Sequence, residues 1–386
     1  MIFANGNGFE IRPRSCTLEA HATMKITDIR TVQLTRRFSR LLRNSCDARD
    51  RRRFTFVLVE TDSGITGLGD APGNQSFMEA IVEKHYKNQA MGMDPCDIDG
   101  LWRRLYPGGA FWEIGGTAVC ALSAIEVACW DIRGKAEGVP VSQLLGGAKR
   151  DWIDAYASDL HWDEPRIMAE TARRFVDEGF RWVKTHIGAE QDNDLVRLEA
   201  IRRAIGPEIG LMIDINTVFD RQTALEQGLR QAAFDPFWYE EPIAPGDYEG
   251  HVWLRERLPM PIATGENLYT VNGFAPMFAC GGCDYAMPDI LRCGGIGQTR
   301  LICEAAAREG VVATPHNFSS GVGLAATLHL MAAVPETRLL EYDTSGTSIY
   351  EEMFIEPLVV KDGRVRVPTA PGLGVALSEE IIAKYR

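Results

Sequence analysis

The segments GLMIDIN (210–216), FWYEEP (237–242) and PIATGE (261–266) decide the fold, because each is a short apolar run with an acidic end. Apolar runs of this length, separated by amphipathic stretches of helical length, predict parallel strands that alternate with helices. The acidic residues at the three ends are Asp214, Glu240 and Glu266. The spacing from 214 to 240 and from 240 to 266 is 26 residues in each case, which fits one strand and one helix.

The same rhythm continues on both sides of these segments. Further runs of strand length are WIDAYAS (152–158), RWVKTHI (181–187), YAMPDI (285–290), VVATPH (311–316) and RLLEYD (338–343). Strands that repeat at intervals of one βα unit predict a barrel, in which the C-terminal ends of all strands meet at one face. The sequence therefore predicts an active site at that face, built from residues at the strand ends.

Titratable side chains at these ends suggest metal and acid–base chemistry. Three carboxylates on consecutive strands repel one another and need a cation, and ligation by oxygen alone suits Mg²⁺. Lys184 and His186 are two residues apart, so both point to one side of their strand and would flank the metal. Asp289 and His316 end neighbouring strands, as expected for a carboxylate that orients an imidazole. Glu341, on the opposite wall, would donate a hydrogen bond if protonated.

Simpler readings of the same residues stay open at this point. The three carboxylates could each pair with a separate basic neighbour, the Lys–His pair could be an exposed strand end, and a lone His is more often structural. The occurrence of all these side chains in order, at barrel spacing, favours a site.

The N-terminal third has a different pattern. ITDIRTVQL (26–34) and FTFVLVETD (54–62) alternate apolar and polar residues and predict antiparallel strands. The segment 35–53 between them is too rich in Arg and too aperiodic for a core element, which indicates a loop. ALSAIEVACWDIRGKAEG (121–138) predicts an amphipathic helix closed by Gly138.

These patterns predict the domain organisation. We expect an irregular extension (1–23), an α+β capping domain (24–147), a barrel (148–354) and a C-terminal segment with a hairpin that packs on the capping domain (355–386).

Taken together, the motifs resemble the enolase superfamily and, within it, the mandelate racemase group. They are the 121–138 helix, VKTHIG (183–188), DIN (214–216), EEP (240–242), GEN (265–267), MPDILRCGGI (287–296) and PHNFSSG (315–321). The resemblance runs from Met24 to the end. It implies an α/β fold with a capping domain over a modified (β/α)₇β TIM-type barrel, and Mg²⁺ bound by Asp214, Glu240 and Glu266. The group usually has Lys-x-Lys where this chain has Lys184 and His186, which argues against a symmetric two-base racemase.

The resemblance also implies the chemistry. An Asp289–His316 dyad serves as acid/base on one face of the substrate, with Lys184 and His186 on the other, and Mg²⁺ stabilises the ene-diolate formed when the proton alpha to a carboxylate is lost. We interpret the chain as a lyase, a dehydratase of an acid sugar (aldonate or aldarate) that loses the β-hydroxyl to give a 2-keto-3-deoxy acid. The alternatives are a racemase, epimerase or lactone cycloisomerase of a hydroxy acid and, in another class, a non-catalytic scaffold protein.

Substrate-binding residues are expected in the Arg-rich segment, which the resemblance places over the site. Arg binds carboxylates through a planar fork, so Arg36, Arg37 and Arg40 are predicted to bind the substrate. A solvated basic loop or a subunit contact explains them as well. Asn216, two residues after Asp214, is predicted to orient the metal shell or a ligand.

Composition limits the partners. The 386 residues carry 41 basic and 53 acidic side chains, and a net charge of -12 disfavours a general nucleic-acid binder. No run approaches the roughly 20 apolar residues of a membrane helix. Nine Cys lack disulfide or zinc spacing and predict reduced thiols in the cytoplasm. A small-molecule carboxylate is the expected partner, in a homo-oligomer such as the superfamily commonly forms.

Overall fold

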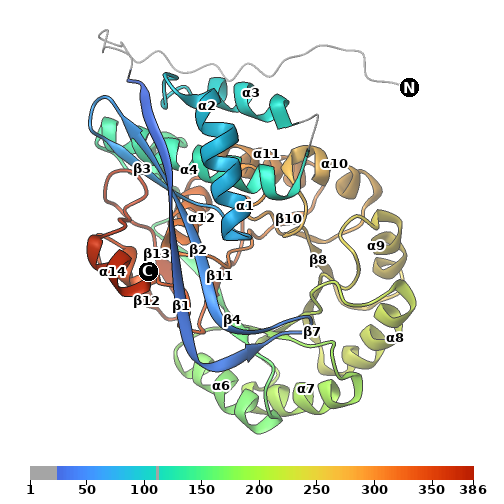
Figure 1. The fold of residues 1–386 in the computed structure, drawn as a ribbon. Coiled ribbons are helices and arrows are strands. Elements are labelled where there is room, and N and C mark those ends of the chain that lie inside the picture. The colour runs from blue at the N-terminus through green and yellow to red at the C-terminus, as the bar shows by residue number, and fades with distance from the viewer. Residues whose placement is uncertain (1–23, 110–112) are drawn as a thin grey trace, which may run out of the picture.

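The computed structural model describes residues 24–109 and 113–386, so the predicted extension 1–23 lies outside the described residues. Its larger part is a barrel of parallel strands wrapped by helices (Figure 1). The strands are β4 (Trp152–Leu160), β5 (Trp182–His186), β6 (Gly210–Asp214), β7 (Pro236–Glu240), β8 (Ile262–Thr264), β9 (Tyr285–Ala286), β10 (Val312–Ala313) and β11 (Leu340–Asp343). Each of the eight predicted strands is present.

Helices connect consecutive barrel strands. They are α6 (Pro165–Asp177), α7 (Gln191–Ile205), α8 (Arg221–Gln231), α9 (Tyr248–Arg255), α10 (Thr270–Cys280), α11 (Gly295–Arg308) and α12 (Gly321–Ala333). β11 pairs with β4, and a bridge between Ala313 and Thr337 joins the β10 side to the β11 side. In the described part of the chain this is the predicted (β/α)₇β order, an α/β fold.

The interior of the barrel is filled with side chains below its C-terminal face. The buried residues that fill it are Tyr156, Met212, Trp238, Ala263, Met287 and Leu339. This packed floor excludes water from beneath the strand ends, so the polar side chains there face a closed base.

The capping domain places an antiparallel sheet beside the barrel. Its strands are β1 (Ile26–Arg43), β2 (Ala48–Thr61) and β3 (Thr66–Asp70), and its helices are α1 (Gln75–Ala80), a π-helical turn (Ile81–Tyr86), α2 (Lys87–Ala90), α3 (Ile98–Gly109) and α4 (Gly116–Glu137). β3 lies tightly on α4, because a Cβ atom at Gly69 would come within 2.0 Å of the Ala124 carbonyl oxygen. As predicted, α4 ends at Gly138, which has the left-handed φ of 68°.

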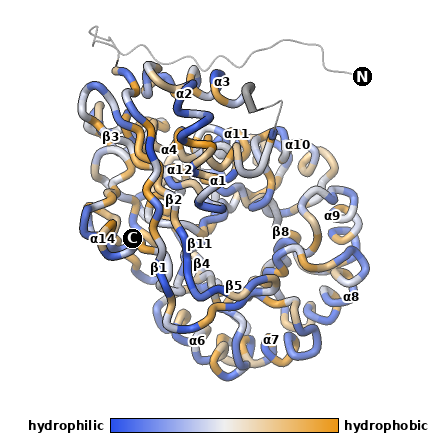
Figure 2. Tube along the Cα trace, in the orientation of Figure 1, coloured by the Kyte–Doolittle hydropathy of each residue, from blue (hydrophilic) through white to orange (hydrophobic). Residues whose placement is uncertain are grey.

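The prediction of a loop for the Arg-rich segment is wrong. β1 and β2 continue through it as one long hairpin, with Thr35 opposite Arg53 and Arg37 opposite Arg51. Backbone hydrogen bonds between two strands do not require alternating apolar side chains. Hydropathy therefore does not reveal the part of a strand that extends beyond the hydrophobic core. Figure 2 shows the distal part of this hairpin as hydrophilic where it crosses toward the barrel.

The hairpin tip is fastened to the loops that follow β4 and β5. The Trp162 backbone N–H donates to the Arg43 carbonyl over 2.9 Å, and the Ser45 hydroxyl donates to the Ile187 carbonyl over 2.6 Å. These contacts set the hairpin over the C-terminal face of the barrel, where the candidate site lies.

The C-terminal hairpin also differs from the prediction. Strands β12 (Val360–Lys361) and β13 (Arg364–Arg366) extend the barrel sheet, with Val365 paired antiparallel to Ile153 of β4, rather than packing on the cap. The residues after the hairpin do reach the capping domain, where the Leu373 backbone N–H donates to Asp131 of α4 over 2.9 Å. The other short helices are α5 (Val141–Leu144), a 3₁₀ turn (Ala232–Phe234), α13 (Tyr350–Met353) and α14 (Glu379–Tyr385).

A buried carboxylate joins the cap to the barrel. Glu126 of α4 accepts hydrogen bonds from the backbone N–H groups of Ile296 and Gly297, each over 2.9 Å, and from the Trp130 indole over 2.8 Å. The two backbone donors belong to the first turn of α11, whose N–H groups have no partner within the helix. Glu126 thus fixes the start of α11 against the capping domain.

We predict that Glu126→Ala destabilises the protein strongly. The substitution leaves three donors without an acceptor, each worth about 1–3 kcal/mol, so the free energy of unfolding should fall by at least about 3 kcal/mol. Thermal or urea unfolding measures this change. The control is Glu137→Ala at the exposed end of the same helix, where the ion pair with Arg133 is worth under about 0.5 kcal/mol. Equal losses in the two variants would contradict the role of Glu126.

Candidate active site

The predicted site residues converge at the C-terminal face of the barrel. In the strand register His186 is opposite Asp214, and Asp214 is opposite Glu240, so the ends of β5, β6 and β7 are level. Glu266 follows β8 by two residues, and Glu341 lies within β11. Parallel pairing of short strands therefore brings side chains that are distant in sequence to one buried cluster.

Lys184 is the central cation of this cluster. Its fully buried ammonium nitrogen lies 2.7 Å from Glu240 Oε1, 2.7 Å from Glu341 Oε1 and 3.6 Å from Asp214 Oδ2. Burial alone lowers the pKa of Lys184, but Glu240 and Glu341 outweigh it and hold that pKa well above its ordinary value. In this arrangement Lys184 is a positive charge held between the carboxylates.

Glu341 is ionised, so it does not meet the condition, protonation, under which it was expected to donate a hydrogen bond. Burial raises the pKa of Glu341, but Lys184 and His316 override this effect and lower it to about 2. Its carboxylate accepts from the Ser158 hydroxyl over 2.7 Å and from Lys184. In this arrangement Glu341 can accept hydrogen bonds and orient Lys184, and it has no proton to give.

The Asp289–His316 pair has the geometry of an oriented imidazole. His316 Nδ1 lies 2.6 Å from Asp289 Oδ2, and His316 Nε2 lies 2.8 Å from Glu266 Oε2. Carboxylate oxygens only accept hydrogen bonds, so both ring nitrogens donate. Burial lowers the pKa of His316, whereas the charges of Glu266 and Glu341 raise it well above its ordinary value. The imidazole is therefore held as a cation with a proton on Nε2.

His186 lies on the β5 side of the cluster. Its Nδ1 is 3.2 Å from Asp214 Oδ2 and 3.1 Å from Asn216 Oδ1, and because both atoms are acceptors, Nδ1 carries a hydrogen. Asn216 adopts the left-handed φ of 51° and donates its backbone N–H to Asp214 over 2.8 Å. Asn216 thus connects His186 to Asp214.

A second histidine beside His186 was missed by the sequence analysis. The ring of His161 stacks on that of His186 with centroids 6.1 Å apart. Burial, with a contribution from His186, lowers the pKa of His161 to about 3, so this ring is neutral. His161 follows β4 directly, and the strand-end criterion would have found it had the predicted strand been drawn to Leu160, where β4 ends.

The structure does not bring Arg36, Arg37 and Arg40 to the cluster. Arg36 donates to the Ser348 carbonyl, Arg40 forms an ion pair of 2.8 Å with Asp163, and Arg37 is exposed. An arginine of the same hairpin that does approach the strand ends is Arg52, which pairs with Asp343 of β11. Because the segment is a hairpin and not a loop, strand alternation decides which arginines face the barrel, and the sequence pattern did not reveal its register.

Neighbouring side chains hold Glu266 in place. Glu241 accepts from the Gly265 backbone N–H over 2.9 Å and from the Asn267 amide over 3.1 Å. Arg292 donates to Asn267 over 2.8 Å, and its guanidinium lies 3.6 Å from Glu266. These contacts fix the loop after β8 and so orient Glu266 toward His316.

The three carboxylates fit a magnesium ion by chemistry but are occupied by cationic side chains. Among the described residues, no group of three or more Asp, Glu, His and Cys side chains is arranged to hold a metal ion. Lys184 instead pairs with Glu240, and His316 pairs with Glu266. The donors are carboxylate oxygens on three adjacent strand ends, the ligands that Mg²⁺ prefers. The set therefore fits Mg²⁺, with Lys184 and His316 as its competitors.

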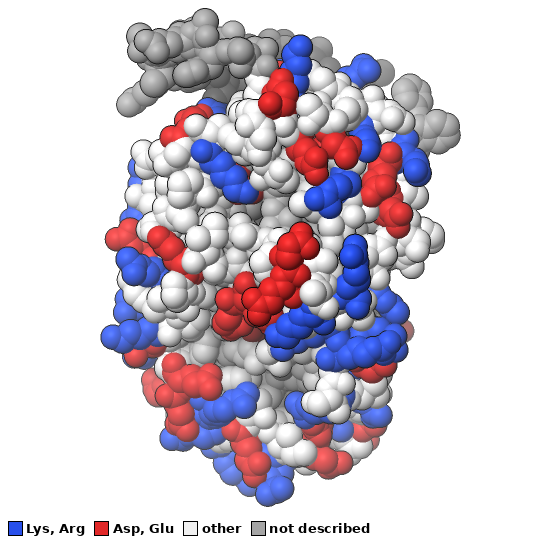
Figure 3. All heavy atoms as spheres, turned by 60° about the vertical axis from the view of Figure 1, so that its left-hand side comes forward, with Lys and Arg blue, Asp and Glu red and all other residues white. Residues whose placement is uncertain are grey.

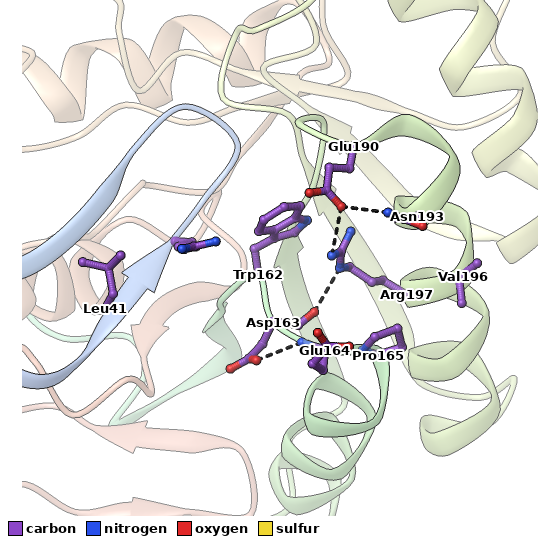
Figure 4. Close-up of a pocket in the computed structure, with 10 residues that line it drawn as sticks. Leu41, Trp162, Asp163, Glu164, Pro165, Glu190, Asn193, Val196 and Arg197 are labelled. Atoms are coloured by element: carbon purple, nitrogen blue, oxygen red, sulfur yellow. Dashed lines mark hydrogen bonds and ion pairs between the residues drawn. The ribbon is translucent and has the colours of Figure 1, made fainter.

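A cavity of about 520 Å³ lies beside the hairpin tip, and Leu41, Arg43, Trp162 and Arg197 are among its lining residues (Figure 4). Arg197 stacks on Trp162 at 4.0 Å and pairs with Glu190 and Asp194, so its charge is used within the protein. None of the predicted catalytic or metal-binding residues lines this cavity. It belongs to the seam between hairpin and barrel.

The surface carries charged side chains of both signs. On the face shown in Figure 3, basic and acidic side chains are interspersed rather than gathered into one basic field of the kind that binds nucleic acid. No helix in the described ranges has the length and apolar character needed to span a bilayer.

Comparisons with known proteins place this geometry in context. Residues 26–146 match the family model described as mandelate racemase / muconate lactonizing enzyme, N-terminal domain, and residues 167–381 match the one described as enolase C-terminal domain-like. The D-galactarolactone cycloisomerase of Agrobacterium fabrum is 33% identical over 94% of this chain and 99% of its own length. The L-talarate/galactarate dehydratase of Salmonella typhimurium is 33% identical over 83% of this chain and 80% of its own length.

A solved structure of similar fold contains a metal. The racemase from Streptomyces coelicolor A3(2) with bound magnesium has a TM-score of 0.85 and 26% identity, covering 93% of this chain and 99% of that chain.

Proposed function

Because the chain belongs to the mandelate racemase / muconate lactonizing enzyme family of the enolase superfamily, we propose that it is a Mg²⁺-dependent acid-sugar dehydratase. The observation that carries the proposal is the pair of histidines in one buried carboxylate cluster, His186 oriented through Nδ1 by Asp214 and Asn216, and His316 oriented through Nδ1 by Asp289 with a proton on Nε2. An elimination needs one group to take a proton and another to give one.

Cationic groups stabilise the charge that develops on the substrate. Asp214, Glu240 and Glu266 would hold Mg²⁺, which when bound stabilises negative charge on the substrate carboxylate. Lys184 adds a fixed ammonium beside the same position and is held there by Glu341. A low-dielectric site strengthens both effects, since the surrounding side chains are buried.

The protein's residues then move two protons. His186 Nε2 takes the proton from the α-carbon. The electron pair of the broken C–H bond moves toward the substrate carboxylate and forms the ene-diolate. As the ene-diolate collapses to a carbon–carbon double bond, the C–O bond at the β-carbon breaks and the departing oxygen takes the proton from His316 Nε2. The resulting enol tautomerises to a 2-keto-3-deoxy acid, and the oxygen leaves as water.

A second candidate is the ring opening of an acid-sugar lactone. It is favoured by the relative from Agrobacterium fabrum, a D-galactarolactone cycloisomerase matched over nearly its whole length. In a lactone the oxygen on the β-carbon can be the ring oxygen, so the same two proton transfers yield an isomer and no water is lost. The choice between the two reactions therefore depends on the substrate and not on the catalytic groups.

The deciding experiment incubates the purified protein with MgCl₂ in D₂O and a panel of aldonates, aldarates and their lactones. Proton NMR and mass spectrometry identify the products. We expect a 2-keto-3-deoxy product lighter than its substrate by one water, apart from the deuterium that C3 takes up from D₂O. A keto product that differs from a lactone substrate only by this deuterium would establish cycloisomerisation instead, and exchange of the α-proton with a new epimer alone would establish racemisation. Absence of any reaction across the panel would refute the acid-sugar proposal.

The two histidines are expected to have separable roles. His316→Asn should lower kcat by about 10²–10⁴-fold while exchange of the α-proton with D₂O persists, because the base remains. His186→Asn should abolish both exchange and turnover. The control is His85→Asn in the capping domain, with exchange followed by NMR and kcat by product formation. Exchange that is lost in His316→Asn but persists in His186→Asn would reverse the assignment.

Magnesium binding is expected to be measurable without substrate. A ligand present at about 100 times its Kd stabilises a protein by about 2.7 kcal/mol, so MgCl₂ should raise the melting temperature relative to EDTA. Asp214→Asn and Glu240→Gln should lose this increase, whereas Asp235→Asn, at an exposed aspartate near the start of β7, should keep it. An increase that persists in both site variants would place the metal elsewhere.

A further inference from the structure

Arg52 is a buried arginine whose guanidinium is held in one orientation. It is 9% exposed and reaches from β2 toward the barrel. Its Nη1 donates to Asp343 Oδ2 over 2.5 Å and to the Thr347 hydroxyl over 3.1 Å. The guanidinium carbon lies 3.7 Å from the centre of the Phe318 ring, so the flat group rests on an aromatic face. Two hydrogen bonds and one stacking contact leave it little freedom.

The residues that hold Arg52 are close in sequence to catalytic candidates. Phe318 is two residues after His316, and Asp343 is two residues after Glu341 in the same strand. At about 3.3 Å per residue, Asp343 lies roughly 6.6 Å beyond Glu341 along β11. Arg52 thus lies at the rim of the carboxylate cluster, on the β10–β11 side, at a separation that suits the length of a sugar chain.

One nitrogen of this guanidinium is unused. Within the part of the chain that the structure describes, Arg52 Nη2 is buried and has no hydrogen-bond partner. Buried side-chain donors almost always have an acceptor, and a charged group is the costliest exception. Arg51, the next residue, is by contrast half-buried and forms an ion pair with Asp50. An unpaired, rigid guanidinium edge beside the catalytic cluster indicates an acceptor that arrives with the ligand.

The expected acceptor is a carboxylate. Asp343 pairs with Arg52 through Oδ2, while its other oxygen, Oδ1, accepts from the Ser345 backbone N–H and hydroxyl. The hydrogen bonds of Arg52 to Asp343 and Thr347 use Nη1 alone, so the donors of Nη2 remain for a further acceptor. A planar carboxylate matches a guanidinium edge better than a single hydroxyl does.

We propose that Arg52 binds the carboxylate at the far end of the substrate, so that the preferred substrate is a dicarboxylic acid sugar or its lactone rather than a monocarboxylic one. The inference rests on the proposed function, in which the first carboxylate lies at the cluster of Lys184, Asp214, Glu240 and Glu266. Arg52 is then a specificity residue that takes no part in proton transfer.

Ligand binding tests this inference without turnover. Calorimetry in MgCl₂ compares adipate with hexanoate, two acids of equal chain length that differ in the second carboxylate. We expect the wild-type protein to bind adipate at least about 30-fold more tightly, and Arg52→Gln to reduce this preference to about threefold or less. Arg51→Gln, on the opposite face of the same strand, should keep the full preference. A preference unchanged in Arg52→Gln, or absent in the wild type, would overturn the proposal.

Kinetics separates specificity from a structural role. With galactarate and galactonate, or whichever matched diacid and monoacid react, Arg52→Gln should lower kcat/KM for the diacid by about tenfold or more, chiefly through KM, and for the monoacid by less than about threefold. Equal losses for both acids would mean that Arg52 only fastens the hairpin. Arg52→Lys keeps the charge and carries the test if Arg52→Gln fails to fold. If the wild type transforms neither acid, the proposed function fails, and the adipate measurement still decides the role of Arg52.

Discussion

Several carboxylates are buried together at the C-terminal face of the barrel, and a buried negative charge is stable only when it is paired. Lys184 forms ion pairs with Glu240 and Glu341, and His316 forms one with Glu266. The same requirement explains why the side chains around them are placed by hydrogen bonds rather than by packing alone. It also explains the fit to Mg²⁺, because a divalent cation would neutralise the carboxylates that Lys184 and His316 neutralise in this structure.

The division of labour between the two parts of the chain follows from this arrangement. Residues that carry charge or protons, such as Lys184 and His316, come from the barrel and are level because strand pairing makes them level. The capping domain contributes Arg52 at the rim and Glu126 at the joint with α11. Chemistry and selectivity therefore lie on different elements, which suits a family whose members are named for different acid-sugar reactions.

The barrel was predictable because two sequence signals mark its strands, namely a short apolar run and a titratable residue at the end of that run. Asp214, Glu240 and His316 could be named on that basis, and the structure brings them to one cluster. The Arg-rich hairpin was not predictable from hydropathy. Its strands are held by backbone pairing, and their residues show no alternation of apolar and polar side chains. Without its register, no pattern could distinguish Arg52 from the arginines that point away. The position of the C-terminal hairpin was predicted wrongly for a related reason. Its side chains do not indicate that its backbone pairs with β4.

The β1–β2 hairpin, which lies over the site, contacts residues that are synthesised near the end of the chain. Arg52 pairs with Asp343, 291 positions later, and Leu373 bonds to Asp131, 242 positions earlier. Contacts of such long sequence separation cost chain entropy before they return any stability, and they slow folding. A ribosome-bound chain can form the β1–β2 ladder early and can place the hairpin tip on the loops after β4 and β5, but Arg52 lacks its partner Asp343 until β11 has emerged. Because β11 also pairs with β4, the site and the barrel are completed together, late in synthesis.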